Sequence, residues 1–441
     1  MGIMGASLAA RPRTRRGRRG SRARGRLWLV LLCAAILLLT PSDGYLGAAR
    51  ADFLISRAVG GEQFRLVAWE MQAIGQKAGD LFARPGAELA PAAQSALVMA
   101  YSDGLGRMDR LQREIERVYA DPAEVDPQAA AAPLLAELTA LRAQQEARRP
   151  AAEWILEHQV AAVLADEGLT VAGRVWPPVL FQFTESPNYL IVSPRDHILV
   201  ERGVYLDPTM DVAQMERIED AVQADLDRSA LVDGTGGFSS YPTMVLAYAD
   251  LAWVIDTIAH EWTHTYLMFR PLGWRYSSSR AMRTLNETVA SIVGAEIAQR
   301  VIERYYPERL NPADWPRPLS MRRGWLHREV VEPDFQFGEF MRKTRLEVDR
   351  LLAAGEVEQA EAYMAAQREI LVARGYVIRK LNQAYFAFHG SYAVGPAATD
   401  PLGAKLRALL RRSATLADFL HTVARFVDPA DLDAALAWHT P

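Results

Sequence analysis

The stretch LAWVIDTIAHEWTHTYLMF, residues 251–269, predicts a buried helix at the centre of the fold. As a helix it carries apolar side chains on nearly every side, which a surface helix does not. It also holds two histidines four positions apart, His260 and His264, with Glu261 directly after the first. Residues four apart share a helix face, so both imidazoles can reach one point. The apolar positions are Leu251, Val254, Ile255, Ile258, Trp262, Leu267 and Phe269.

Imidazoles and a carboxylate in a buried helix need partners, because an isolated buried charge is costly. A metal ion would supply that partner. The pattern His-Glu-x-x-His is the spacing of zinc peptidases, in which two histidines bind the metal and the glutamate takes a proton from metal-bound water. The alternative is an ordinary core in which His260 and His264 make only hydrogen bonds.

A third ligand is predicted in TLNETVAS, residues 284–291, where Glu287 stands in the next expected helix. If the two helices run antiparallel across a connection at residues 270–279, His264 lies about 9 Å before the turn and Glu287 about 10 Å after it, at about 1.5 Å per residue. The two side chains then meet at one level. We therefore expect Zn²⁺ as the cofactor, held by His260, His264 and Glu287.

The pair HExxH and, on the next helix, NExxA resembles the gluzincin zinc metallopeptidases, the clan of thermolysin and the zinc aminopeptidases. LNETVAS, residues 285–291, is closer to the aminopeptidase form of the second motif, since the thermolysin form has an aspartate where Ser291 stands. The resemblance implies zinc ligands His260, His264 and Glu287, with Glu261 as the general base toward a zinc-bound water. It implies that Asn286 is a supporting neighbour and that the reaction is hydrolysis of peptide bonds.

Two departures from the gluzincin pattern bear on specificity. The 22 residues between His264 and Glu287 are more than the family usually has, which predicts an enlarged connection. The acidic sequence that holds a free amino terminus is also not found, so aminopeptidase or internal cleavage stays open. In the clan an edge strand before the metal helix adds an extended peptide, and Gly236 and Gly237 with Tyr241 to Val245 occupy that place here; the alternative is an ordinary hairpin turn and core strand.

A zinc peptidase also needs a donor for the oxyanion of its tetrahedral intermediate. LNQAYFAFHGSYAVG, residues 381–395, offers Tyr392 and His389 first, and Tyr385 after them. The alternative for all three is simple aromatic packing. The other histidines are expected to be structural or exposed: His158, His197, His327, His421 and His439.

The patterning predicts a predominantly helical α+β protein, with a small β-sheet before a zincin-type helix pair. Residues 52–170 read as a helical N-terminal region with a connection near residues 122–132, and residues 171–310 as the metallopeptidase core. Within this core, residues 212–227 are predicted to form a helix. Asp250 is predicted to cap the next helix and the serines at 277–279 the one after it, with Pro271 and Pro307 as stops. Residues 311–441 read as a helical C-terminal region.

Residues 1–51 differ from the rest in charge and hydropathy. Ten of the 50 basic residues lie in the first 50 positions, against one of the 53 acidic residues; the remaining 40 basic and 52 acidic residues leave a net charge of -12, which argues against nucleic acid as a partner. The apolar run at residues 27–40 predicts an extracytoplasmic protein with a single membrane-spanning anchor; the alternative is secretion after cleavage near Ala51. The only cysteine, Cys33, lies in that run, so a zinc site must use histidine and carboxylate.

A peptide or protein is the expected substrate, and the oligomeric state stays open. The alternative function is a non-catalytic exported or membrane-anchored helical protein with a structural zinc site. A structural zinc site is normally closed by four protein ligands, so this alternative requires a fourth ligand residue. A metal-free core with an interaction role is a further alternative.

Overall fold

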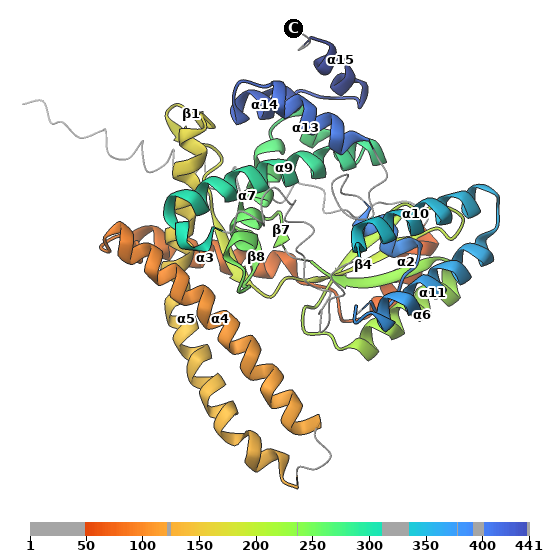
Figure 1. The fold of residues 1–441 in the computed structure, drawn as a ribbon, viewed down its shortest axis with the longest axis horizontal. Helices are drawn as coiled ribbons and strands as arrows, with labels where there is room; N and C mark the ends of the chain where they lie inside the picture. Colours follow the sequence, from red (N-terminus) through yellow and green to blue (C-terminus); the bar gives the residue numbers. More distant parts are fainter. Residues whose placement is uncertain are drawn as a thin grey trace, which may run out of the picture. The chain divides into compact units, whose positions relative to one another are not determined.

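Helices make up most of the chain, and the predicted predominantly helical α+β class is confirmed. The structure is a computed structural model that describes residues 49–120, 125–235, 237–310, 335–376, 378–390 and 401–438. The residues from Phe53 onward form one compact unit. Figure 1 shows its helices in the order of the chain.

The N-terminal part consists of helices, and two of them form a long pair (Figure 1). In this pair, α4 and α5 lie side by side and bury a small cluster around Leu111 and Leu138. The Asp126 side chain caps α5 by accepting from the Ala129 amide, so the helix begins inside the stretch that the sequence predicts as a connection. The bounds are α2 (Ala49–Val59), α3 (Leu66–Ala83), α4 (Pro91–Ala120) and α5 (Pro127–Asp166).

The strands form three small sheets where the sequence predicts one. The hairpin of β1 (Thr170–Val171) and β2 (Arg174–Val175) stands alone. The second sheet has the order β3-β8-β7, with β3 (Phe181–Thr184) parallel to β8 (Thr243–Leu246) and β7 (Gly237–Phe238) antiparallel at the edge. The third is antiparallel in the order β5-β4-β6, from β4 (Asn188–Ser193), β5 (Arg202–Leu206) and β6 (Ser229–Gly234).

The helix α6 (Val212–Leu226) leads from β5 to β6 and packs on β6. It begins with a capping box between Asp211 and Gln214, which satisfies amide groups at its first turn. The strand β6 is not predicted by the sequence, because SALVDG is short and ends in residues typical of turns. Its central residues are buried all the same, since β6 pairs with β4 along its whole length.

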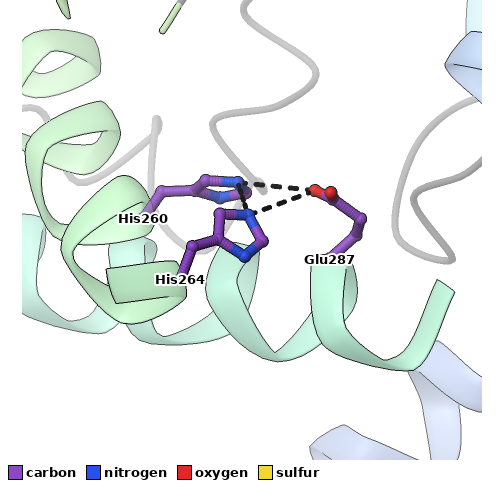
Figure 2. Close-up of side chains that lie close together, drawn as sticks. All are labelled: His260, His264 and Glu287. Atoms are coloured by element: carbon purple, nitrogen blue, oxygen red, sulfur yellow. Dashed lines mark hydrogen bonds and ion pairs between the residues drawn. The ribbon is translucent and has the colours of Figure 1, made fainter. Parts of the chain in front are cut away.

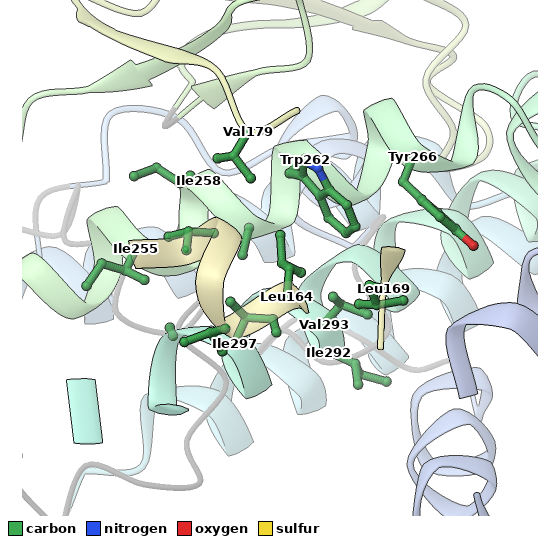
Figure 3. Close-up of a cluster of buried hydrophobic side chains, with 14 of the residues drawn as sticks. Leu164, Leu169, Val179, Ile255, Ile258, Trp262, Tyr266, Ile292, Val293 and Ile297 are labelled. Atoms are coloured by element: carbon green, nitrogen blue, oxygen red, sulfur yellow. The ribbon is translucent and has the colours of Figure 1, made fainter. Parts of the chain in front are cut away.

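Two helices at the centre of the unit carry the predicted motifs: α7 (Leu251–Leu267) and α9 (Arg280–Tyr305), with the short α8 (Pro271–Trp274) between them. Asp250 caps α7, as predicted, and Ser279, the last of the three serines predicted to offer a cap, caps α9. The largest hydrophobic core surrounds this pair (Figure 3), with α7 contributing Ile258 and Trp262 and α9 contributing Val293. Helix α5 adds Leu164 to the same core. The helix pair is therefore held rigidly by buried apolar contacts.

The C-terminal helices pack on α9 and on the antiparallel sheet. Helix α13 packs on α9, and α12 packs on β4 and β6. Helices α10 and α11 pack against each other and help to form a second core with Ile191 and Leu231 of the antiparallel sheet. The bounds are α10 (Phe337–Ala353), α11 (Val357–Ala373), α12 (Gln383–His389), α13 (Leu402–Arg412), α14 (Leu416–Val423) and α15 (Ala430–Trp438).

The prediction of a single membrane-spanning anchor is not supported by any described helix. None of the helices in the described part of the chain combines the length and the apolar character that a membrane crossing requires. The apolar run at residues 27–40, with Cys33, lies outside the described residues.

Candidate metal centre

The structure brings the three predicted ligands together (Figure 2). His260 and His264 extend from α7 and Glu287 from α9 toward one point. The two histidine Nε2 atoms are 3.1 Å apart, and Glu287 Oε2 lies 3.6 Å from Nε2 of His260 and 3.4 Å from Nε2 of His264. His260 and Glu287 are buried, and His264 is nearly so. Two imidazole nitrogens and a carboxylate oxygen thus converge in a site shielded from solvent.

The spacing of these atoms fits a tetrahedral zinc ion. Ligand atoms at about 2.0–2.2 Å from zinc lie about 3.3–3.6 Å from one another when the angles are tetrahedral, close to the observed 3.1, 3.6 and 3.4 Å. The Oε2 atom of Glu287 is also buried without a hydrogen-bond partner among the described residues. A buried carboxylate oxygen in that state is costly unless a cation faces it. The donor set, nitrogen and oxygen without sulfur, is one that zinc accepts.

Asn286 fixes the orientation of the His264 ring. His264 Nδ1 lies 2.8 Å from Asn286 Oδ1, an oxygen that can only accept a hydrogen bond. The proton of the neutral ring is therefore on Nδ1, and the lone pair is on Nε2, which points to the convergence of ligand atoms. The Asn286 amide in turn reaches the carbonyl of Leu272 at 3.5 Å. This contact places Asn286 where a supporting neighbour would lie, and the role that the resemblance implies for it stays a prediction.

The electrostatics of the cluster attract positive charge. Burial lowers the pKa of His264, but the charges of Glu287 and Glu261, and the contacts with Glu287 and Asn286, outweigh it and raise this pKa to about 9. Burial raises the pKa of Glu287, but the charges of His264 and His260 hold it well below its usual range. Without a metal, Glu287 is therefore ionised and His264 carries a second proton at neutral pH, and a metal ion bound at His264 would have to displace that proton.

Glu261 extends from the same helix toward the edge strand β7. A Cβ atom added to Gly237 on β7 would lie 2.9 Å from Oε1 of Glu261 and 2.8 Å from a methyl group of Thr257. The glycine therefore lets the strand approach the carboxylate. Of the stretch predicted as a peptide-binding edge, Gly237 lies on the edge strand, β8 is the central strand of its sheet, and Gly236 lies outside the described residues.

A second glycine sets the distance between the two helices at the metal centre. A Cβ atom on Gly294 of α9 would lie 2.9 Å from the backbone oxygen of Asp256 and 3.2 Å from Cβ of His260. Both contacts are shorter than ordinary van der Waals separations. Gly294 lies two turns after Glu287, so it allows α9 to approach α7 beside the ligands.

The predicted oxyanion donors have partners elsewhere in the fold. His389 Nε2 lies 2.9 Å from Asp233 Oδ2 on β6, and its ring packs on Tyr385 with the centroids 4.2 Å apart. Burial and the charge of Asp233 raise the pKa of Tyr385, which keeps its proton. Tyr392 lies outside the described residues. Contact with Asp233 and aromatic packing account for the positions of His389 and Tyr385, and their catalytic role stays a prediction.

Of the remaining histidines, His158, His197 and His421 are exposed, whereas His327 and His439 lie outside the described residues.

One residue at the metal centre is not predicted from the sequence. Tyr276, in the connection between α8 and α9, donates a hydrogen bond from its hydroxyl to Oε1 of Glu287 at 2.6 Å. Its ring stands edge-on to His264, with the centroids 6.3 Å apart. The connection has no periodic pattern, so nothing in the sequence indicates which of its side chains turns toward the ligands.

The resemblance to gluzincins rests on the residues described above and on their spacing. No protein-family model matches the chain, and comparison with curated proteins and with solved structures finds no similar protein.

Proposed function

We propose that the chain is a zinc-dependent metallopeptidase. The observation that carries the proposal is the convergence of His260 Nε2, His264 Nε2 and Glu287 Oε2 at mutual distances of 3.1–3.6 Å, in a buried site where Oε2 has no hydrogen-bond partner among the described residues. A chance HExxH sequence does not require a buried glutamate from another helix to face both histidines.

The proposed reaction assigns metal binding and proton transfer to different residues. His260, His264 and Glu287 would hold the ion, which when bound supplies a Lewis acid that polarises a carbonyl group and acidifies water. Glu261 follows His260 directly, so its carboxylate lies beside the ligands and can accept a proton from a water molecule and pass it to the leaving amine. Because Gly237 has no side chain, the backbone of β7 passes close to this carboxylate.

The number of ligands favours catalysis over a structural role. Structural zinc sites are closed by four protein ligands, whereas catalytic sites have three and leave a position open. Within the described part of the chain, the cluster contains three ligand residues. A non-catalytic protein with a structural zinc site is the competing function.

The test measures zinc per chain and peptide hydrolysis for the full-length protein. We expect one zinc per chain in the wild type and a large drop in zinc content in Glu287→Ala, in which the two histidines still bind the ion weakly. Glu303→Ala, which removes an exposed glutamate from the same helix, is expected to keep the zinc. Glu261→Gln is expected to keep zinc and lose hydrolysis of an unstructured protein substrate such as casein by at least about 100-fold.

The results distinguish a catalytic zinc site from a structural zinc site and from a chain that binds no zinc. Zinc that stays bound with no hydrolysis in wild type or variant, across a peptide library, would support the structural site. A wild-type chain that takes up no zinc after reconstitution at neutral pH would overturn the proposal altogether.

A further inference from the structure

The hydroxyl of Tyr276 donates a hydrogen bond to the carboxylate of Glu287, the proposed third metal ligand. The hydroxyl lies 2.6 Å from Oε1, within the range of a strong, charge-assisted hydrogen bond. An ionised carboxylate oxygen can only accept a hydrogen bond, so the hydroxyl of Tyr276 is the donor. The guanidinium of Arg283 lies over the Tyr276 ring, 5.3 Å from its centroid.

The position of Tyr276 is built into the connection between α7 and α9. Its amide donates to the carbonyl of Gly273 at 3.1 Å, which closes a turn after α8. Gly273 packs against the end of α7 so closely that an added Cβ atom would lie 2.0 Å from the backbone oxygen of Leu267. The amide of Leu272 is held by the carbonyl of Ala424, just after α14. The turn that carries Tyr276 is thus held by the end of α7 and by the residue that follows α14.

The two carboxylate oxygens of Glu287 therefore make different contacts. Oε1 accepts from Tyr276, whereas Oε2 faces His260 and His264 at 3.6 and 3.4 Å. A glutamate without the tyrosine could rotate about its last torsion angle, which is broad, and present either oxygen or both. A strong hydrogen bond on one oxygen removes that freedom and leaves a single oxygen for the ion.

We propose that Tyr276 is a positioning residue that holds Glu287 as a one-oxygen ligand of the bound metal. The inference rests on the proposed zinc site but not on its catalytic activity. It gives the enlarged connection between the two motifs a role, since this connection supplies the hydroxyl that orients the third ligand.

The test compares zinc affinity in Tyr276→Phe and in a matched control, Tyr266→Phe, by competition with a chromophoric chelator. Both changes remove one tyrosine hydroxyl, but the hydroxyl of Tyr266 is buried without a hydrogen-bond partner among the described residues. Losing the partner of a metal ligand costs about 10- to 100-fold in metal affinity. We expect a loss of that size in Tyr276→Phe and less than about twofold in Tyr266→Phe.

A second variant shows whether the tyrosine acts through Glu287. In a Glu287→Ala background, Tyr276→Phe is expected to cause no further loss of zinc affinity, because the group that it positions is gone. The cobalt(II)-loaded protein gives an independent reading: we expect Tyr276→Phe to weaken the visible absorption, since a carboxylate free to bind through both oxygens raises the coordination number.

The outcomes distinguish this inference from the proposed function. A wild-type chain that binds no zinc overturns both. A wild-type chain that binds zinc, together with a Tyr276→Phe variant of equal affinity and unchanged cobalt spectrum, overturns the positioning role alone. An equal loss with and without Glu287 would show that the tyrosine acts on the fold rather than on the ligand, and would also overturn it.

Discussion

Two buried clusters of charged side chains hold the helices of this protein together, and they differ in one respect. In the first, Lys77 of α3 reaches two glutamates of α5, with Nζ 2.7 Å from Glu153 and 2.9 Å from Glu157. In the second, His260 and His264 of α7 face Glu287 of α9. The first cluster contains a permanent cation and the second does not.

The lysine cluster also satisfies the backbone around it. Glu157 accepts from the amide of Phe181 at 3.0 Å, and Glu153 accepts from the amide of Phe183 at 2.8 Å. The two carboxylates therefore join the parallel strand β3 to α5 as well as binding the lysine. Every charge in this cluster has a partner, as buried charges require.

The histidine cluster has no permanent cation to meet this requirement. Glu287 Oε2 is buried without a hydrogen-bond partner among the described residues, although Oε1 and the His264 ring are held by Tyr276 and Asn286. The difference suggests how a structural charge cluster can be told from a candidate metal site: a structural cluster contains its own cation, whereas in the proposed metal site neighbouring side chains orient the ligand residues toward one point.

The largest expected effect comes from removing the cation of the first cluster. Lys77→Met leaves two buried carboxylates facing each other, and breaking a buried ion pair in this way costs about 3–5 kcal/mol in free energy of unfolding. Urea unfolding of the variant would measure the loss. Zinc is expected to leave the loss unchanged, because the lysine cluster does not bind metal.

A comparable instability in Arg57→Met, whose ion pair with Asp225 is largely exposed, would show that burial is not the cause. Exposed pairs contribute about 0–1 kcal/mol. A loss in Lys77→Met no larger than that would contradict the view of the first cluster as a structural element.

A smaller effect is expected from the helix spacing at the second cluster. Gly294→Ala places a methyl group 2.9 Å from the Asp256 backbone oxygen and 3.2 Å from Cβ of His260, so α7 and α9 must separate. We expect a loss of about 1–3 kcal/mol in free energy of unfolding, typical of overpacking, together with weaker zinc binding. Thermal unfolding and chelator competition would measure the two effects.

The matched control is Gly79→Ala in α3, where an added Cβ atom meets nothing within 4 Å. This change is expected to stabilise the protein by about 0.4–1 kcal/mol, because alanine restricts the unfolded chain. Equal effects of the two substitutions would show that the approach of α7 and α9 is not critical.

The smallest effect is a pH dependence that belongs to the first cluster. Burial raises the pKa of Glu157 from 4.5 to about 7, although Lys77 opposes the shift. The folded chain therefore binds a proton that the unfolded chain releases between about pH 4.5 and 7, and stability falls as the pH rises through this window. The slope from this group is at most about 1.4 kcal/mol per pH unit.

Urea unfolding across that range should show the slope in the wild type and a shallower one in Glu157→Gln, which cannot ionise. Glu137→Gln, an exposed position on the same helix, should keep the wild-type slope. Parallel pH profiles for wild type and Glu157→Gln would refute the assignment of the slope to Glu157.

The sequence predicted the parts of the fold and the site that depend on local patterns. Spacing along two helices predicted that His260, His264 and Glu287 would converge, and the caps Asp250 and Ser279 lie where the helices begin. These features follow from helix geometry, which is the same in every protein.

The features that the sequence did not predict depend on contacts between segments that are distant in the chain. The strand β6 is defined by its pairing with β4 rather than by its own residues. Tyr276 lies in a connection whose path is set by contacts such as that of Leu272 with Ala424. The Lys77 cluster joins residues 76 positions apart, and no local pattern relates them.

The same difference in sequence separation has a consequence for folding. The groups that build the metal centre lie close in the chain, with His264 and Asn286 only 22 positions apart, whereas Lys77 and Glu153 are separated by 76. Contacts between near neighbours close smaller loops and form faster. We expect α7 and α9 to pair early. A metal ion at the proposed site would then bind before the N-terminal helices have docked and would act as a nucleus for the rest.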